Sequence, residues 1–345
     1  MSAAMELDRL QATDGEIAAI NLTSARRRAW TRFAQDAGRT GFAEAVIQNE
    51  LLAAQFLGDL DAFDRLETFA AQLARLGDPP RAALLQAQVA SAVHRFDDAR
   101  RHLARGASMG APSEEIARQV LTIDQACGVD PERIVASRSA IAAASCQLED
   151  LVPFGAALAD LERFTEADAV YRQALADYDG ISPFPAAWVC FQLGALWGEL
   201  AAVPDADCAA AWYRRALAYL PGYVKARVHL AEISLGQGQT ADAEALLLPA
   251  LASSDPEVRW RLGDVLIAQG RLEEAVAQLE AARLGFEDIL EKHLLAFADH
   301  AAEFYAGSGN DPAHALELAR VNAANRPTRR ALAQVHAIAA KGADA

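Results

Sequence analysis

Residues 221–270 read PGYVKARVHLAEISLGQGQTADAEALLLPALASSDPEVRWRLGDVLIAQG, and this stretch decides how the chain folds. Its landmarks return 32 residues later, Leu230 at Leu262, Gly238 at Gly270 and Ala243 at Ala275. A fixed period of this size is typical of a repeat array. Each unit holds two amphipathic segments joined by a glycine turn, which predicts a helix–turn–helix that cannot bury its apolar face alone.

The unit resembles the tetratricopeptide repeat. The shared marks are a leucine and a small residue in the first helix (Leu230-Ala231), a small residue in the second helix (Ala243) and a closing proline (Pro256). The resemblance implies an all-α, right-handed α-solenoid of about seven antiparallel helix–turn–helix repeats, with capping helices at both ends. It says little about function, because repeats of this kind serve many unrelated processes.

The period extends in both directions from this stretch. Phe96, Ala99 and Leu103 recur as Phe164, Ala167 and Tyr171, each 68 residues later, so one degenerate unit should lie between them. We therefore expect a helical N-terminal cap over 1–40, divergent hairpins over 41–148, clear repeats over 149–327, and a C-terminal capping helix with its tail over 328–345. A softer joint is expected near 108–148.

Two structural expectations follow from the repeat. The helices should have about 10–16 residues, and no sheet should form. Ala209, Ala243 and Ala275 should be buried where the two helices of a hairpin touch, because only a small side chain fits there.

The composition of the chain narrows the class of partner. The 345 residues carry a net charge of −15, and only 7% of them are aromatic. Phosphate binding needs a basic stripe, so nucleic acid is not expected as a partner. The densest basic cluster, Arg26-Arg27-Arg28 with Arg32, is interpreted as a solvated helix face.

The spacing of the cysteines and the composition of the N-terminal segment indicate the cellular compartment. Cys127, Cys146, Cys190 and Cys208 show no metal-ligand spacing and are interpreted as reduced packing residues, with a Cys190–Cys208 bridge as the alternative. The start of the chain lacks a basic segment followed by an apolar one, and no apolar run reaches the ~18–20 residues of a membrane span. We expect a soluble cytoplasmic protein without membrane insertion; the alternative is a periplasmic protein whose leader has been removed.

The sequence contains no motif of a catalytic or cofactor-binding site. A nucleophile elbow, a phosphate-binding glycine loop and a zinc-protease motif are all missing, so we expect no enzyme activity and no cofactor. One polar cluster, His293, Asp299, His300 and Glu303, has side chains that can bind zinc or act as acid and base. The favoured interpretation is that these are solvated groove residues without a metal.

A binding surface is better supported. Stacked repeats line a concave face with their first helices, and residues spaced i, i+4, i+7 share one helix face. The expected groove residues are Trp188 and Gln192, Lys225, His229 and Glu232, Arg261 and Asp264, and His300 and Glu303. Trp188 and Arg261 are the candidate anchors, because aromatic and arginine residues carry most of the binding energy in interfaces.

Some tetratricopeptide-repeat proteins hold a chaperone's C-terminal carboxylate with a Lys/Asn/Arg clamp. The matching positions here are acidic or small, namely Ala195, Glu232, Asp264 and Glu303, so that specificity is not expected. The mixture of charges suits a segment that carries its own basic and apolar residues.

We therefore expect a non-catalytic adaptor that binds another protein or a peptide segment. Two alternatives stay open: a regulator whose superhelix closes on a peptide or small ligand, and a metal-binding or enzyme accessory subunit that uses His293, His300 and Glu303. An open groove favours the adaptor, a closed superhelix with a cavity favours the regulator, and a metal ion or deep polar pocket favours the accessory subunit.

Overall fold

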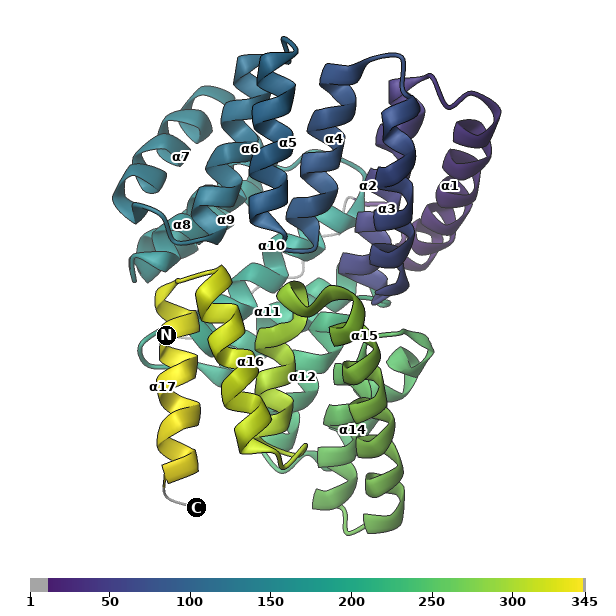
Figure 1. Cartoon of the computed structure of the whole chain (residues 1–345). Coiled ribbons are helices and arrows are strands. Elements are labelled where there is room, and N and C mark those ends of the chain that lie inside the picture. Colours follow the sequence, from purple (N-terminus) through teal and green to yellow (C-terminus); the bar gives the residue numbers. More distant parts are fainter. Residues whose placement is uncertain (1–11, 344–345) are drawn as a thin grey trace.

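The computed structural model describes residues 12–343, which form helices and connecting turns without any strand (Figure 1). Its α-helices are α1 Gly15–Gln35, α2 Thr40–Leu57, α3 Asp61–Gln72, α4 Pro79–Ala92, α5 Phe96–Ser108, α6 Ser113–Ala126, α7 Pro131–Ser145, α8 Leu148–Asp160, α9 Phe164–Ala176, α10 Pro183–Ala195, α11 Ala206–Tyr219, α12 Val224–Gly236, α13 Thr240–Leu247, α14 Pro256–Ala268, α15 Leu272–Ala306, α16 Pro312–Asn325 and α17 Arg329–Ala343. The fold is the all-α solenoid that the repeat period predicts.

Consecutive helices pair into hairpins. The pairs are α2–α3, α4–α5, α6–α7, α8–α9, α10–α11, α12–α13, α14 with the first part of α15, and the second part of α15 with α16. This makes eight hairpins in the described chain, close to the expected seven, with α1 and α17 packed at the two ends. The pair predicted to be degenerate is the loosest, because α6 packs chiefly on α5 and α7 chiefly on α8.

Four helices depart from the expected length of about 10–16 residues. α1 has 21 residues, α2 has 18 and α13 only 8. α15 has 35 residues, and its backbone breaks at His293, where φ is −133° and ψ is 43°. The second helix of one hairpin therefore continues into the first helix of the next without a loop. No glycine or proline in the sequence marks the break at His293.

Small residues hold the two helices of a hairpin together, as predicted. Ala209 and Ala243 are 0% exposed and Ala275 is 1% exposed. The same closeness explains Gly194, where a Cβ atom would lie 2.5 Å from the ring of Tyr213 in the partner helix. The apolar core therefore runs along the contact within each hairpin, and each hairpin adds to it.

The solenoid returns on itself, so that two tiers of helices meet. Figure 1 shows α1–α7 in the upper tier and α12–α17 in the lower tier. Where they meet, the amide of Ser254 donates to the carbonyl of Gly58 (3.0 Å), and the amide of Leu60 donates to Ser254 Oγ (2.8 Å). The ring of Phe56 lies against those of Phe184 and Tyr223, with centroids 5.1 and 4.8 Å away.

Polar contacts continue along this junction, which we call the seam. Its residues are Gly58, Leu60, Asp64 and His94 in the upper tier and Ser254, His293 and Asn325 in the lower tier. His293 Nε2 is hydrogen-bonded to Asp64 Oδ1 at 2.6 Å, and Asn325 donates its side-chain amide to the carbonyl of His94 at 3.0 Å. The seam joins the upper tier to the lower tier, so the solenoid is closed on itself.

All four cysteines are free. Cys190 is buried and Cys208 is half-buried, in the two helices α10 and α11 of one hairpin. The structure therefore agrees with the interpretation of packing cysteines for Cys127, Cys190 and Cys208, but Cys146 is exposed after the last residue of α7, where it packs in no core. None of the helices in residues 12–343 combines the length and the apolar character that crossing a membrane requires.

Candidate functional site

Three successive hairpins present polar residues at the same height of their first helix. α12 carries Lys225, His229 and Glu232, α14 carries Glu257, Arg261 and Asp264, and the second part of α15 carries His300 and Glu303. Their neighbours Leu230, Ala231 and Leu262 are buried in the core, so the polar residues occupy a different face of the same helices. We call the polar set, with Glu199, the polar row.

Ion pairs connect the polar row from one helix to the next. His229 Nδ1 lies 2.9 Å from Glu199 Oε1 and 3.5 Å from Glu232 Oε2. Arg261 Nη2 then donates to Glu232 Oε1 at 2.5 Å, and Arg261 Nη1 lies 3.7 Å from Asp264 Oδ2. The spacing i, i+4, i+7 thus brings together residues from α12 and α14, as predicted from the sequence.

Arg261 is held on two sides. Its guanidinium lies over the indole of Trp260, with the carbon Cζ 3.6 Å from the ring centroid. Trp260 Nε1 donates to Ser308 Oγ at 3.2 Å, and Ser308 donates in turn to Asp264. Because a stacked and ion-paired arginine is fixed in one orientation, Arg261 organises the centre of the polar row.

A second group of ion pairs lies around His300. His300 Nδ1 contacts Glu257 Oε1, which comes from α14, and Asp299 Oδ2 accepts from Arg326 at 2.7 Å. Burial by itself would lower the pKa of His300, but the negative charges of Glu257 and Asp299 outweigh burial and raise that pKa to about 10. His300 is therefore a cation at neutral pH.

The protonation of Glu199, Glu232 and Asp264 follows from the same competition between burial and nearby charges. Burial would raise the pKa of Glu199, but the hydrogen bond and charge of His229, with the charge of Arg330, lower it to about 2. Burial raises the pKa of Glu232 and that of Asp264, against the opposing effect of Arg261. These two carboxylates are therefore less fully stabilised than Glu199 and would gain from a further cation.

A hollow of about 220 Å³ opens beside these carboxylates, between α12 and α14. Its lining residues are Ala231, Glu232, Leu235, Gly236, Arg261, Asp264 and Val265. The lining combines apolar side chains with two acids and one arginine. A space of this size admits one long side chain, and this lining can recognise a side chain with an aliphatic stem and a charged end.

The structure leaves two predicted groove residues outside the network. Trp188 and Gln192, both on α10, make no side-chain hydrogen bond within residues 12–343. Trp188 is half-buried and packs against the largest hydrophobic core. Their part in binding therefore stays a prediction. Lys225 and Glu303 lie beside the network: Lys225 has no ion pair among the described residues, and Glu303 accepts from Gln334 at 3.3 Å.

The predicted histidine and carboxylate cluster does not assemble. Because α15 breaks at His293, that imidazole turns to the seam, where it binds Asp64, whereas His300 faces Glu257 and Asp299. Within residues 12–343, no group of three or more His, Cys, Asp or Glu side chains has the geometry to hold a metal ion. The spacing along one stripe assumed a straight helix, and the break invalidates that assumption.

Sequence reasoning missed several members of the site. Glu199 comes from a π-helical turn, Leu196–Leu200, that follows α10, and Tyr213 donates its hydroxyl to Glu199 at 3.2 Å. Arg330 and Gln334 reach the row from α17, the C-terminal cap. None of these residues has the repeat spacing, so no periodic signal could have found them.

Comparisons with known proteins agree with the repeat. Family models described as the tetratricopeptide repeat match residues 205–254 and 256–282. The crystal structure of a Rap protein complexed with competence and sporulation factor is similar, with 14% identity and a TM-score of 0.55. That similarity covers 95% of this chain and 100% of the Rap chain. No curated protein matches the sequence significantly.

Two further structures are more loosely similar. The Cut9–Hcn1 hetero-tetramer of the APC/C gives 14% identity and a TM-score of 0.45 over 86% of this chain, which spans 62% of the length of that one. The human IFIT1 dimer with m7Gppp-AAAA gives 16% identity and a TM-score of 0.38 over 91% of this chain and 75% of the other. Of these three structures, the Rap structure, with a TM-score of 0.55, is the one that supports the shared architecture.

Proposed function

Because the chain is a tetratricopeptide-repeat protein with an α-solenoid fold, we propose that it is a non-catalytic adaptor that binds a segment of another protein along its polar row. The repeat fold supports a protein-interaction scaffold in general. The observation that carries the proposal is the meeting of α12, α14 and α15 side chains in one ion-paired row beside the 220 Å³ hollow. No cofactor is needed for this function.

The chemistry of the hollow indicates what the bound segment carries. Glu232 and Asp264 line the hollow together with the apolar side chains of Leu235 and Val265. A lysine or arginine side chain of the partner would lay its stem on the apolar side chains and bring its charge to the two carboxylates. Arg261 already compensates part of their charge, so one additional cation fits better than several.

The same balance of charges argues against nucleic acid on this face. Carboxylates outnumber lysine and arginine along the polar row, and a phosphate backbone would meet them at close range. The human IFIT1 dimer was solved with m7Gppp-AAAA, but its TM-score of 0.38 lends no argument here. We therefore propose a protein or peptide partner.

A peptide-display selection against the immobilised full chain tests the proposal. We expect enrichment of sequences with a lysine or arginine next to apolar residues. The variant E232Q/D264N should bind a selected peptide at least about tenfold more weakly, because the cation loses both carboxylates. The matched control is D242N/E273Q, which makes the same two chemical changes at exposed residues of α13 and α15.

Two results would refute the proposal. One is a selection without basic enrichment. The other is equal binding by E232Q/D264N and wild type. Circular dichroism and thermal unfolding of both variants establish that a loss of binding is not a loss of fold.

A peptide-sensing regulator is the second candidate, and the seam favours it. A solenoid closed on itself can change shape when a ligand binds inside, and the structurally similar Rap protein was crystallised with competence and sporulation factor. Hydrogen exchange separates the two functions. A selected peptide that alters exchange at Gly58–Asp64 and around His293 supports a regulator, whereas a change confined to α12 and α14 supports the adaptor.

A further inference from the structure

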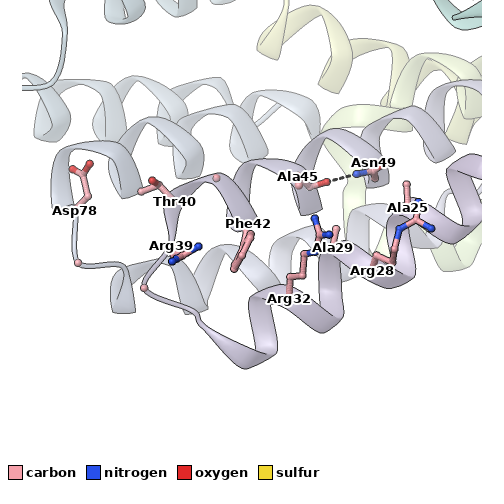
Figure 2. Close-up of a pocket in the computed structure, with 13 residues that line it drawn as sticks. Ala25, Arg28, Ala29, Arg32, Arg39, Thr40, Phe42, Ala45, Asn49 and Asp78 are labelled. Atoms are coloured by element: carbon pink, nitrogen blue, oxygen red, sulfur yellow. Dashed lines mark hydrogen bonds between the residues drawn. The ribbon is translucent and has the colours of Figure 1, made fainter.

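A second hollow, of about 880 Å³, lies between α1 and α2, on helices that contribute nothing to the polar row. Figure 2 shows Arg28 and Arg32 on α1 and Arg39 in the following turn, on either side of Phe42. Alanines from both helices, Ala25, Ala29 and Ala45, complete the lining together with glycines, Thr40, Asn49 and Asp78. The hollow therefore combines an apolar floor with a basic rim.

Two arginines of this rim, Arg28 and Arg32, are not used by the fold, because their exposed side chains make no hydrogen bond or ion pair within residues 12–343. Arg39 pairs with the exposed Asp36 at 3.2 Å and lies over the ring of Phe42, with Cζ 5.6 Å from the centroid. Their neighbour Arg26 behaves differently, because it donates to the buried Glu50 at 2.9 Å. Of the predicted basic cluster, one arginine thus stabilises the fold and the outward ones form a positive surface.

Acidic residues neutralise only part of the rim: Asp36 pairs with Arg39, whereas Arg28 and Arg32 have no acidic partner within residues 12–343. Asp78 is the one acid among the lining residues, and it caps α4 by accepting from the amide of Arg81 at 3.1 Å. In a chain with a net charge of −15, a positive hollow of this kind stands against the average charge of the molecule.

The outer face of α1 adds an apolar strip to the same surface. Ile17 is 53% exposed and Ile20 is 66% exposed. Ile17 precedes Arg28 by 11 residues, about three helical turns, so these two side chains leave the helix on the same side, while Ile20 lies about 80° around the helix from Arg28. Within the described chain α1 packs chiefly on α2, so its outer face has no covering helix.

We propose that this face, which we call the α1 face (Ile17, Ile20, Arg28, Arg32, Arg39 and Phe42), binds an acidic amphipathic helix of a partner protein. Carboxylates of that helix pair with the arginines, and its apolar side chains cover the isoleucines and reach Phe42. The isoleucines favour a protein segment over nucleic acid, because a phosphate backbone makes no use of an aliphatic strip. The chain is acidic overall and repels other negatively charged molecules. A short acidic segment carries few negative charges, so this repulsion is weaker for it than for a nucleic acid.

Fluorescence anisotropy with three labelled probes and the full chain tests this proposal. The probes are a helical peptide of about 18 residues with Glu and Leu at helical spacing, its counterpart with Lys for Glu, and a single-stranded oligonucleotide of equal negative charge. We expect the acidic peptide to bind, to weaken as salt rises, and to lose at least about tenfold in affinity in R28E/R32E. The control R214E/R320E makes the same charge change at two exposed arginines that form no ion pair with any residue of 12–343.

A second variant examines the apolar part. I17S/I20S should weaken the acidic peptide while leaving any binding of the oligonucleotide unchanged. The proposal is overturned if the acidic peptide does not bind, or if the control variant loses as much affinity as R28E/R32E. It is also overturned if the oligonucleotide binds more tightly than the peptide, which would assign the face to nucleic acid. Sedimentation that shows a dimer lost in R28E/R32E would instead assign the face to a second copy of the chain.

Discussion

The contact between the two helices of a hairpin and the contact across the seam differ in the kinds of interaction that form them. Inside a hairpin, Ala243 and Gly194 let two helices approach closely, and the interface is apolar and buried. Across the seam, Ser254, Asp64 and His293 join the tiers through hydrogen bonds. Apolar contacts of Phe56, Leu60 and Phe63 accompany them. Hairpin contacts therefore determine whether the chain folds, whereas the seam determines the shape of the folded solenoid.

The difference has an energetic consequence. A fully buried apolar contact cannot accept an added methylene group without moving backbone, whereas Asp64, whose side chain is 39% exposed, can exchange part of its contact with the buried His293 for water. Substitutions in the hairpins should therefore lower the free energy of unfolding more than substitutions in the seam. Substitutions in the seam should in turn alter exchange and dimensions without unfolding the chain.

The largest effect is expected for Ala243→Leu. Ala243 is fully buried between α12 and α13, so the larger side chain should overpack the contact and cost about 1–3 kcal/mol of unfolding free energy. Ala241→Leu, at an exposed position on the same helix, is the control and should change stability by less than about 0.5 kcal/mol. Denaturant titration measures both. Equal stability of the two variants would mean that the hairpin contact does not lie where the structure has it.

A smaller effect is expected for Asp64→Asn in the seam. The substitution removes the charge that faces His293 at 2.6 Å and Lys292 at 3.2 Å, but Asp64 is 39% exposed, so water replaces part of the loss. We expect a cost of about 1 kcal/mol or less. Faster hydrogen exchange at Gly58–Asp64 and a larger radius of gyration in X-ray scattering should accompany it.

Asp61→Asn is the control for this experiment, because it removes an exposed charge from the same helix without touching the seam. If both variants keep wild-type exchange and dimensions, the ion pair between Asp64 and His293 does not hold the tiers together. If Asp64→Asn unfolds the chain as far as Ala243→Leu does, the distinction between hairpin and seam is wrong.

The two regions also differ in how far the sequence predicts them. The hairpin contact repeats at a fixed period, so spacing alone places Ala209, Ala243 and Ala275 in the core. The same spacing predicts that His229, Glu232 and Arg261 meet on one side of two helices. The contact depends on neighbours within about 35 residues, which is the range of a repeat.

The seam joins residues some 200 positions apart, such as Gly58 and Ser254, and no period marks them. Its position depends on the rotation between successive hairpins added over the whole chain, which small deviations such as the break at His293 alter. The same limit explains Arg330 and Gln334, which reach the polar row from the capping helix. It also explains the failure of the predicted His293 cluster, because the helix that carries it is not straight.

The change of stability with pH tests one contact of the polar row, that of His300 with Glu257 and Asp299. The pKa of His300 is raised from 6.5 to about 10 in the folded chain, against the effect of burial, by Glu257 and Asp299. Stabilisation from this proton is therefore complete below about pH 6.5 and is lost as pH rises through about 10. His300→Gln should have a lower melting temperature than wild type at pH 6, and the two should converge toward pH 10.

His336→Gln is the control, because His336 is an exposed residue of α17. Its melting temperature should follow that of wild type over the whole pH range. A constant difference between His300→Gln and wild type from pH 6 to pH 10 would mean that the contact of His300 with Glu257 contributes no proton-linked stability.

The smallest effect on stability, and a decisive one for binding, is expected for Gln192→Arg. Gln192 lies on α10 one turn after Trp188, and neither residue joins the ion-paired row, so whether the binding surface extends to α10 is open to experiment. The residue is half-exposed, and an arginine there should change stability by no more than about 0.5 kcal/mol. If the segment that fills the hollow also crosses α10, the added positive charge repels its basic residues and weakens binding by about tenfold. Gln173→Arg, exposed on α9, adds the same charge away from that path. Binding of a selected basic peptide that is lowered by Gln192→Arg but not by Gln173→Arg extends the surface to Trp188. Equal affinities would confine it to α12, α14 and α15 and leave Trp188 as a residue of the core.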